Sequence, residues 1–452
     1  MQQSVRDVSN VIDWMGGTRQ LLEKDDPQFK AAAMQRFQLT DAEWEAKRQD
    51  LLEKLNASIA NAQSQATRSI QAAVSPSSKP FVPAEKFGAA FQSAMEEHVN
   101  DRVTSTTQAE AAGVPTPFGP PEKFDSGDPG WAIVLVARLD EAFKGKHVFV
   151  HSNDLSVFRY DMPPNASVAL FGDWATGEPP ALSIKATIER QSPDYTIHLG
   201  DTYYAGFEDE IRHNLVACWP GKVQPRKSFT LNGNHEMYSG GNAYFNALPL
   251  FGQSASYFNL GNQYWRLIAL DTSYPERNGD SPAQSWGELV DMELPNGTQV
   301  REVDWLAAQV EHARSFDPPA RIILLTHHQL FSAFDGDALG KYLLPQIKPF
   351  LDKGDIYAWF WGHEHRGIVY GPNATSNVKA RCIGHAGFPQ PPSSLKDAAH
   401  VAQFPIAWLE DRTEPDNAWY GMRGFALLRL AGKDAWVDYI DETGSKRYSE
   451  QL

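Results

Sequence analysis

Seven side chains with oxygen or nitrogen donors follow apolar runs and carry the clearest chemical signal in the sequence. They are Asp173, Asp201, Tyr204, Asn234, His327, His363 and His365. Carboxylate, phenol, amide and imidazole groups without a thiolate are a ligand set that suits Fe, Mn, Zn or Mg. A single aspartate after a strand mostly fixes a turn, so the set as a whole carries the signal. The sequence therefore predicts a metal site assembled from distant parts of the chain.

Four further polar residues stand beside these donors. His235 and Glu236 lie in "GNHE", His328 in "LLTHH" and His385 in "IGHAGF". His235 is a candidate for contact with a substrate oxygen and for protonating the leaving group, and Glu236 for orienting His235 or the nearby backbone. His328 and His385 are candidates for contact with a bound substrate. A purely structural role stays open for both.

Strand-length apolar runs must position these donors. The runs are "SVALFGDW", "DYTIHLGD", "SFTLNGNHE", "YWRLIALDT", "RIILLTHH" and "YAWFWGHEH". Helical stretches such as "PPALSIKATIERQ" and "REVDWLAAQVEHAR" fall between several of them. Alternating strands and helices predict an α/β fold with buried sheets, in which ligands gather at the carboxyl ends of strands. Asp271 also ends such a run, and we expect it to fix a turn.

The beginning of the chain has a different character. Residues 1–74 are predicted to be helical, and Thr40 with Glu43 forms a capping-box pattern ahead of an apolar face. That face is expected to pack within the chain, with a partner or a second copy as alternatives. Stretches rich in Pro, Ser and Gly follow, up to residue 130. We therefore expect a helical region and linker over 1–125 and a catalytic domain over 126–452.

Composition limits the functions to consider. The formal net charge of −15 opposes a nucleic-acid scaffold, which needs many basic contacts to phosphates. Two cysteines far apart suggest neither a disulfide framework nor a thiolate zinc site. The first residues do not resemble a signal peptide, and the longest apolar run is too short to span a bilayer. Cytoplasmic residence without membrane attachment is the expectation.

Five motifs in fixed order resemble the calcineurin-like metallophosphoesterase superfamily, and most of all the purple acid phosphatases. They are "GDWA" at 172–175, "GDTYY" at 200–204, "GNHE" at 233–236, "LLTH" at 324–327 and "GHEH" at 362–365. The purple acid phosphatase pattern is GDxG, GDxxY, GNH[ED], VxxH and GHxH. The resemblance covers about 165–400 and implies a four-layer α/β/β/α sandwich, with the N-terminal helical region outside it.

The resemblance also implies how the donors divide between two metals. One metal would take Asp173, Tyr204 and His365, and the other Asn234, His327 and His363, with Asp201 bridging both. His328 is the alternative to His327. The implied cofactors are Fe(III) in the Tyr204 site and a second divalent metal, which is Fe, Zn or Mn.

Ala175 and Tyr204 bear on the choice of iron. Many superfamily members carry a metal-binding histidine at the position of Ala175, which cannot ligate. The phenol of Tyr204 would fill this deficit, and a phenolate is a hard anionic donor that suits ferric iron. Tyr203 is expected to be the packing tyrosine of this pair.

The implied function is hydrolysis of phosphomonoesters, in which a hydroxide held by the metals attacks phosphorus. A phosphodiesterase or nucleotide hydrolase with Mn or Zn in both sites is the enzymatic alternative. A catalytically silent binding module that engages a partner through its N-terminal helix is the non-enzymatic one. The expected partner of the site is a small-molecule phosphate ester, and the N-terminal helices could join two copies of the chain.

Overall fold

The computed structural model of the chain describes one nearly continuous part and scattered earlier positions. Before residue 145 it describes 19, 22–25, 27, 30, 34, 40–46, 48, 49, 52, 134 and 137; the rest is 145–275, 287–294, 297–334, 340, 342–373, 376–389, 403–413 and 420–452. The chain divides into two compact units, one comprising Met1–Lys146, Tyr238–Gly240 and Arg277–Ser285, the other His147–Met237, Gly241–Glu276 and Trp286–Leu452.

In the first unit, the start of the predicted helix is confirmed. Residues 41–46 are helical. The backbone N–H of Thr40 donates to Oε2 of Glu43 at 2.9 Å, and the backbone N–H of Glu43 lies 3.3 Å from Oγ1 of Thr40. This reciprocal pair is a capping box. The continuation of the apolar face beyond Leu52 lies outside the described residues, so its role in packing or association stays a prediction.

The second unit contains two large sheets and a hairpin. The eight-stranded sheet has the order β1 (Arg159–Asp161), β5 (Phe258–Gly261), β6 (Trp265–Ala269), β9 (Arg321–Thr326), β10 (Ile356–Trp361), β12 (Lys379–Ile383), β11 (Gly367–Tyr370), β13 (Ile406–Leu409). The six-stranded sheet has the order β16 (Lys446–Gln451), β15 (Asp434–Asp441), β14 (Gly424–Ala431), β2 (Asn165–Phe171), β3 (Tyr195–His198), β4 (Ser228–Thr230). Strands β7 (Asp291–Glu293) and β8 (Gln299–Arg301) form the hairpin.

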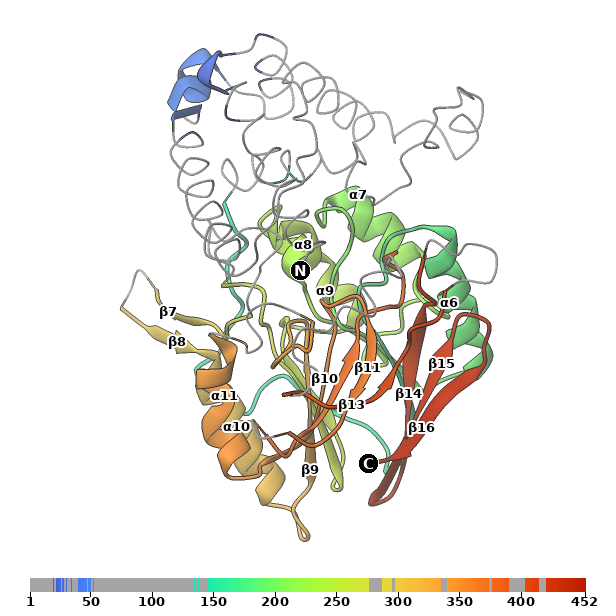
Figure 1. The fold of residues 1–452 in the computed structure, drawn as a ribbon. Helices are drawn as coiled ribbons and strands as arrows, with labels where there is room; N and C mark the ends of the chain where they lie inside the picture. Colours follow the sequence, from blue (N-terminus) through green and yellow to red (C-terminus); the bar gives the residue numbers. More distant parts are fainter. Residues whose placement is uncertain are drawn as a thin grey trace. The chain divides into compact units, whose positions relative to one another are not determined.

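The helices cover the outer faces of the two large sheets. They are α6 (Pro179–Gln191), α7 (Glu208–Glu210), the π-helix η3 (Ile211–Ala217), α8 (Asn234–Met237), α9 (Asn242–Phe251), α10 (Glu302–Arg314) and α11 (Leu343–Asp352). Figure 1 shows α10 and α11 on one side of the sheets and α6 on the other.

Alternating side chains along each strand build three separate apolar cores. In β9, Leu324 packs with α10 and α11, while Leu325 points into the core between the sheets. In β2, Leu170 points into that same central core, while Phe171 packs with α6 and α9 on the other side. This period of two is expected when both faces of a sheet are buried. The predicted four-layer α/β/β/α sandwich is confirmed.

Parallel pairing brings the functional strand ends together. In one sheet β2, β3 and β4 are parallel neighbours, and in the other β9, β10 and β12 are. All six predicted strand runs are strands: β2, β3, β4, β6, β9 and β10. Within the described residues, no helix is both long and apolar enough to cross a membrane.

Candidate metal centre

The predicted donors come directly after strands, and several occupy unusual backbone conformations. Asp173 follows β2, Asp201 follows β3, and His363 and His365 follow β10. Their φ angles are 57°, 76°, 64° and 51° respectively, all in the left-handed region. Residues other than glycine adopt this region at an energetic cost, and such strain gathers at functional sites. The sharp turns aim four side chains at one place.

A first group of donors forms around Asp173. Its Oδ1 lies 3.4 Å from Nε2 of His365, and its Oδ2 accepts the backbone N–H of His363 at 2.8 Å. Ligand-type atoms of Asp173, Asp201 and His365 all lie within 4.8 Å of one another. The hydroxyl of Tyr203 lies among them, 3.2 Å from Oδ1 of Asp173, 3.2 Å from Oδ2 of Asp201 and 2.9 Å from Nε2 of His365.

This placement of Tyr203 corrects the sequence analysis. Tyr204 was predicted to be the phenol donor and Tyr203 to be packing, but the hydroxyl in the donor group belongs to Tyr203. The backbone sets the direction: the N–H of Tyr203 donates to the carbonyl of Ala175 at 3.1 Å, and the N–H of Tyr204 donates to Glu210. The turn that carries both tyrosines thus brings the hydroxyl of Tyr203 among the donors.

A second group forms around His327. Its Nε2 lies 3.0 Å from Oδ1 of Asn234, 3.2 Å from Nδ1 of His363 and 3.4 Å from Oδ1 of Asp201. Its Nδ1 lies 2.9 Å from the carbonyl oxygen of Leu199, which can only accept, so Nδ1 carries the proton and Nε2 its lone pair. Asp201 is therefore the carboxylate that both groups share.

His328 is a second imidazole within reach of this group. Ligand-type atoms of His327, His328 and His363 lie within 4.8 Å of one another. Nδ1 of His328, however, lies 3.0 Å from the hydroxyl of Thr272. The geometry thus brings both histidines to the site. His327 is the one whose Nε2 lies 3.0 Å from Asn234 and 3.4 Å from Asp201.

Two observations fit cations in this arrangement. Lone pairs of His327, Asn234 and Asp201 face one another, and such acceptors repel each other. A cation between them would attract all three. Glycines also leave room at the carboxylates: a Cβ on Gly233 would lie 2.0 Å from Oδ1 of Asp201, and a Cβ on Gly362 would lie 2.6 Å from Oδ2 of Asp173. Donor chemistry and space both suit metal ions.

The electrostatics of the site follow from burial. Burial and the neighbouring Asp201 raise the pKa of Asp173. Burial also acts on Asp201, but the imidazoles of His235 and two further histidines outweigh it and lower the pKa of that carboxyl. Burial lowers the pKa of His363 to about 3 and raises the pKa of Tyr203 well above its ordinary value. An ionised Asp201 beside the neutral ring of His363 is a protonation state in which both can bind a metal.

His235 and Glu236 take different places. Nδ1 of His235 lies 2.5 Å from the carbonyl oxygen of Tyr204, and its Nε2 lies 3.7 Å from Oδ2 of Asp201, so the Nε2 edge of the ring faces the donors. Oε2 of Glu236 accepts the backbone N–H groups of Asp201 and Gly233 at 3.2 Å and 2.7 Å. Glu236 thus holds the two turns that carry ligands, which is the backbone alternative considered for it.

The remaining predicted residues lie nearby or in structural roles. His385 follows β12 and shares a small pocket with His365. Asp271 fixes a turn, because its Oδ1 accepts the backbone N–H groups of Ser273 and Tyr274. The sequence analysis missed Phe388, whose ring stacks on His365 with centroids 4.0 Å apart. Phe388 is the last residue of "IGHAGF", the segment in which the sequence analysis singled out only His385.

Comparisons with known proteins show what the chain resembles. A family model described as calcineurin-like phosphoesterase matches residues 166–367. Among solved structures, GAP50, the anchor in the inner membrane complex of Plasmodium, is 12% identical over 64% of this chain and 88% of its own, with a TM-score of 0.45. A purple acid phosphatase from yellow lupin seeds is 16% identical over 64% of this chain and 54% of its own, with a TM-score of 0.44.

A third solved structure, a putative 5'-nucleotidase from Staphylococcus aureus, is 16% identical over 64% of this chain and 54% of its own, with a TM-score of 0.35. The chain thus spans about half the length of the lupin phosphatase and of the Staphylococcus aureus protein. A search of the curated proteins found no match. The predicted resemblance to the calcineurin-like metallophosphoesterases is confirmed for the part of the chain that the family model covers.

Proposed function

We propose that this chain, whose residues 166–367 match the calcineurin-like phosphoesterases, is a hydrolase of phosphomonoesters that holds two metal ions. The observation that carries the proposal is the position of Asp201 between two donor groups. Its Oδ2 lies 3.2 Å from the Tyr203 hydroxyl and its Oδ1 lies 3.4 Å from Nε2 of His327. A carboxylate shared in this way suits a pair of cations, which is the arrangement used for in-line displacement at phosphorus.

The residues divide into two ligand sets. Asp173, Tyr203 and His365 would hold one ion, Asn234, His327 and His363 the other, and Asp201 both. The phenol favours Fe(III) for the first ion, and the amide and imidazoles accept Fe, Zn or Mn for the second. When bound, such a pair lowers the pKa of water and neutralises charge on a phosphate.

His235 is the residue best placed to act on the substrate. Its Nδ1 is engaged by the carbonyl of Tyr204, which holds the ring with Nε2 toward the donor groups. In its imidazolium form the ring also carries a proton on Nε2, which can then be donated to the leaving oxygen of an ester. The ring also packs against the tilted ring of Tyr203, with centroids 4.4 Å apart, so its orientation is held from two sides.

The test combines metal analysis with turnover of two model substrates. Protein as isolated should contain two metal ions per chain, one of them iron, and should absorb visible light through phenolate-to-iron charge transfer. It should hydrolyse an aryl phosphomonoester faster than the matching aryl diester. Faster diester turnover with Mn or Zn in both sites would instead support the phosphodiesterase alternative, and the absence of metal and of turnover would refute both.

A further inference from the structure

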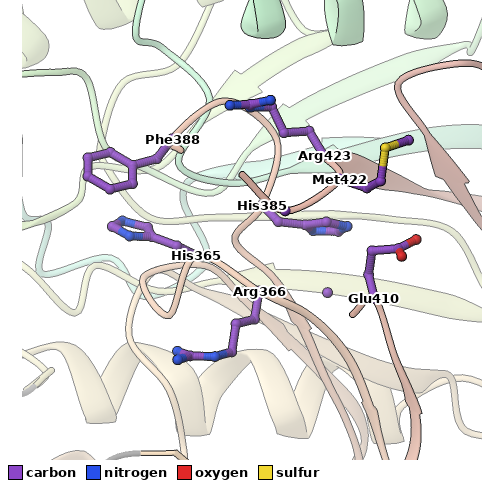
Figure 2. A pocket seen from close by; sticks show the side chains of 9 residues that line it. His365, Arg366, His385, Phe388, Glu410, Met422 and Arg423 are labelled. Carbon is purple, nitrogen blue, oxygen red and sulfur yellow. The ribbon is translucent and has the colours of Figure 1, made fainter. Parts of the chain in front are cut away.

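A small pocket is lined in part by His365, one of the proposed metal ligands. Figure 2 shows its lining side chains, which include His365, His385, Phe388, Glu410 and Arg423. The pocket is just large enough to hold one water molecule. The chemistry of the lining decides whether a water would be held there.

His365 brings a hydrogen-bond donor to this pocket. Its Nε2 is the atom that faces Tyr203 and Asp173, at 2.9 Å and 3.4 Å. If Nε2 binds a metal, the proton of the neutral ring must sit on Nδ1, which then needs an acceptor. Within the described part of the chain, we find no hydrogen bond from this Nδ1, whereas the corresponding Nδ1 of His327 has the carbonyl of Leu199 at 2.9 Å.

His385 brings an imidazole with unused hydrogen-bonding capacity. The residue is 6% exposed, and its Nδ1 is buried without a hydrogen-bond partner among the described residues. Two glycines make space for the far end of the ring: a Cβ on Gly367 would lie 2.5 Å from its Nε2, and a Cβ on Gly424 would lie 2.7 Å from the same atom. The backbone is thus shaped around the ring of His385, and that ring lines the pocket.

The charged residues of the pocket are Arg366, Glu410 and Arg423, and each has partners. The guanidinium of Arg366 donates to the carbonyl of Glu364 at 2.9 Å. The carboxylate of Glu410 accepts two hydrogen bonds from Arg412, at 2.8 Å and 2.7 Å. The guanidinium of Arg423 donates to the carbonyl of Gly387 at 3.3 Å and lies 3.7 Å from Glu442. A neutral ligand between the two imidazoles therefore fits this pocket better than an ion does.

We propose that this pocket binds one ordered water, which accepts a hydrogen bond from Nδ1–H of His365 and donates one to the imidazole of His385. His385 is then a positioning residue that fixes the ring of His365 through the water. This inference rests on the proposed function, since it assigns a partner to one of the proposed metal ligands. Loss of such outer partners typically weakens metal binding by about ten-fold to a hundred-fold.

The test compares His385→Leu, His385→Gln and Gly367→Ala for the rate at which iron is lost to a chelator, followed by metal analysis and the visible spectrum. His385→Leu should lose iron at least about ten-fold faster than the parent protein. His385→Gln keeps a polar end in the pocket and should stay within about three-fold. Gly367→Ala removes no polar group from the protein, but its Cβ would displace the imidazole of His385. It should therefore behave like His385→Leu.

Matched variants control for general destabilisation. Gly371→Ala introduces a Cβ with its nearest neighbour at 3.4 Å, and His312→Leu removes an imidazole that contacts Arg266, outside the pocket. Both should release iron at the parental rate. Folded His385→Leu and Gly367→Ala proteins with parental release rates would overturn the inference while leaving the proposed function intact.

A second measurement tests the inference even if the parent protein binds no metal. Absence of metal would overturn the proposed function itself. A high-resolution crystal structure should show one ordered water between His365 and His385. A dry pocket, or an ion in place of the water, would refute the inference directly.

Discussion

The phenolic oxygen of Tyr203 lies 2.9 Å from Nε2 of His365. These residues come from the turns after β3 and β10, which belong to different sheets. This contact makes Tyr203 the phenol donor for the proposed first metal. The role of Tyr204 differs, and its backbone N–H donates to Glu210.

The two tyrosines can be distinguished by paired substitutions. Tyr203→Phe removes the hydroxyl from the donor group, so the visible absorption should disappear and affinity for the first metal should fall by at least about ten-fold. Tyr204→Phe keeps that hydroxyl in place and should retain the band. Absorption spectra and iron analysis of the two proteins give the answer, and the opposite pattern would restore Tyr204 as the ligand.

Gly233 tests whether space beside Asp201 is required. A Cβ at this position would lie 2.0 Å from Oδ1 of Asp201, far inside van der Waals contact. Gly233→Ala should therefore abolish binding of at least one metal and reduce ester turnover at least about a hundred-fold. The control is Gly371→Ala, where the nearest atom is 3.4 Å away. Equal metal content in the two purified proteins would contradict the expectation.

Chelation should destabilise the protein without unfolding it. Ligand binding to the folded state contributes about 4 kcal/mol per site when free metal is about a thousand times its Kd. The three apolar cores do not depend on the site, so the metal-free protein should keep its far-ultraviolet circular dichroism. Its midpoint in thermal unfolding should fall and recover on adding metal. A midpoint insensitive to chelator would argue against occupied sites.

Glu302 predicts a pH dependence away from the site. Its carboxylate accepts the backbone N–H of Asp271 at 2.8 Å, and burial followed by the charge of Asp271 raises its pKa well above the ordinary value of 4.5. Stability from this group is complete below pH 4.5 and declines as pH rises toward the folded-state pKa, because only the unfolded chain ionises there. The loss approaches about 1.4 kcal/mol per pH unit.

The matching variant is Glu302→Gln, which mimics the neutral acid. Its free energy of unfolding, relative to that of the parent protein, should increase between pH 4 and pH 7. The increase should be at most about 1.4 kcal/mol for each pH unit. Urea unfolding at several pH values, with metal absent throughout, measures the difference. A difference that stays constant with pH would show that Glu302 is ionised in the folded protein.

Much of this architecture was predictable because the strands are buried on both faces. Their sequences are continuous apolar runs that end in polar donors, and parallel pairing places those ends together. Asp173, Asp201, Asn234, His327, His363 and His365 all occur at such ends, and the structure brings them into two groups that share Asp201.

What could not be predicted depends on backbone direction and on distant contacts. Tyr203 and Tyr204 are identical in chemistry, and which phenol enters depends on the path of a turn held by contacts such as Tyr203 N–H to Ala175. The stacking of Phe388 on His365 requires β12 to lie beside β10. No local periodicity encodes either contact.

The pairing of β14 with β2 has a consequence for how the protein is made. Leu170, in the strand that leads to Asp173, is joined to Ala426, near the end of the chain. While the ribosome is still translating the middle of the message, β2 lacks its neighbour on this side. The sheet that aims the first carboxylate can close only after most of the chain has emerged. We therefore expect a nascent chain to bind metal ions only after synthesis has passed β14. Contacts between residues so distant in sequence should also make folding slow.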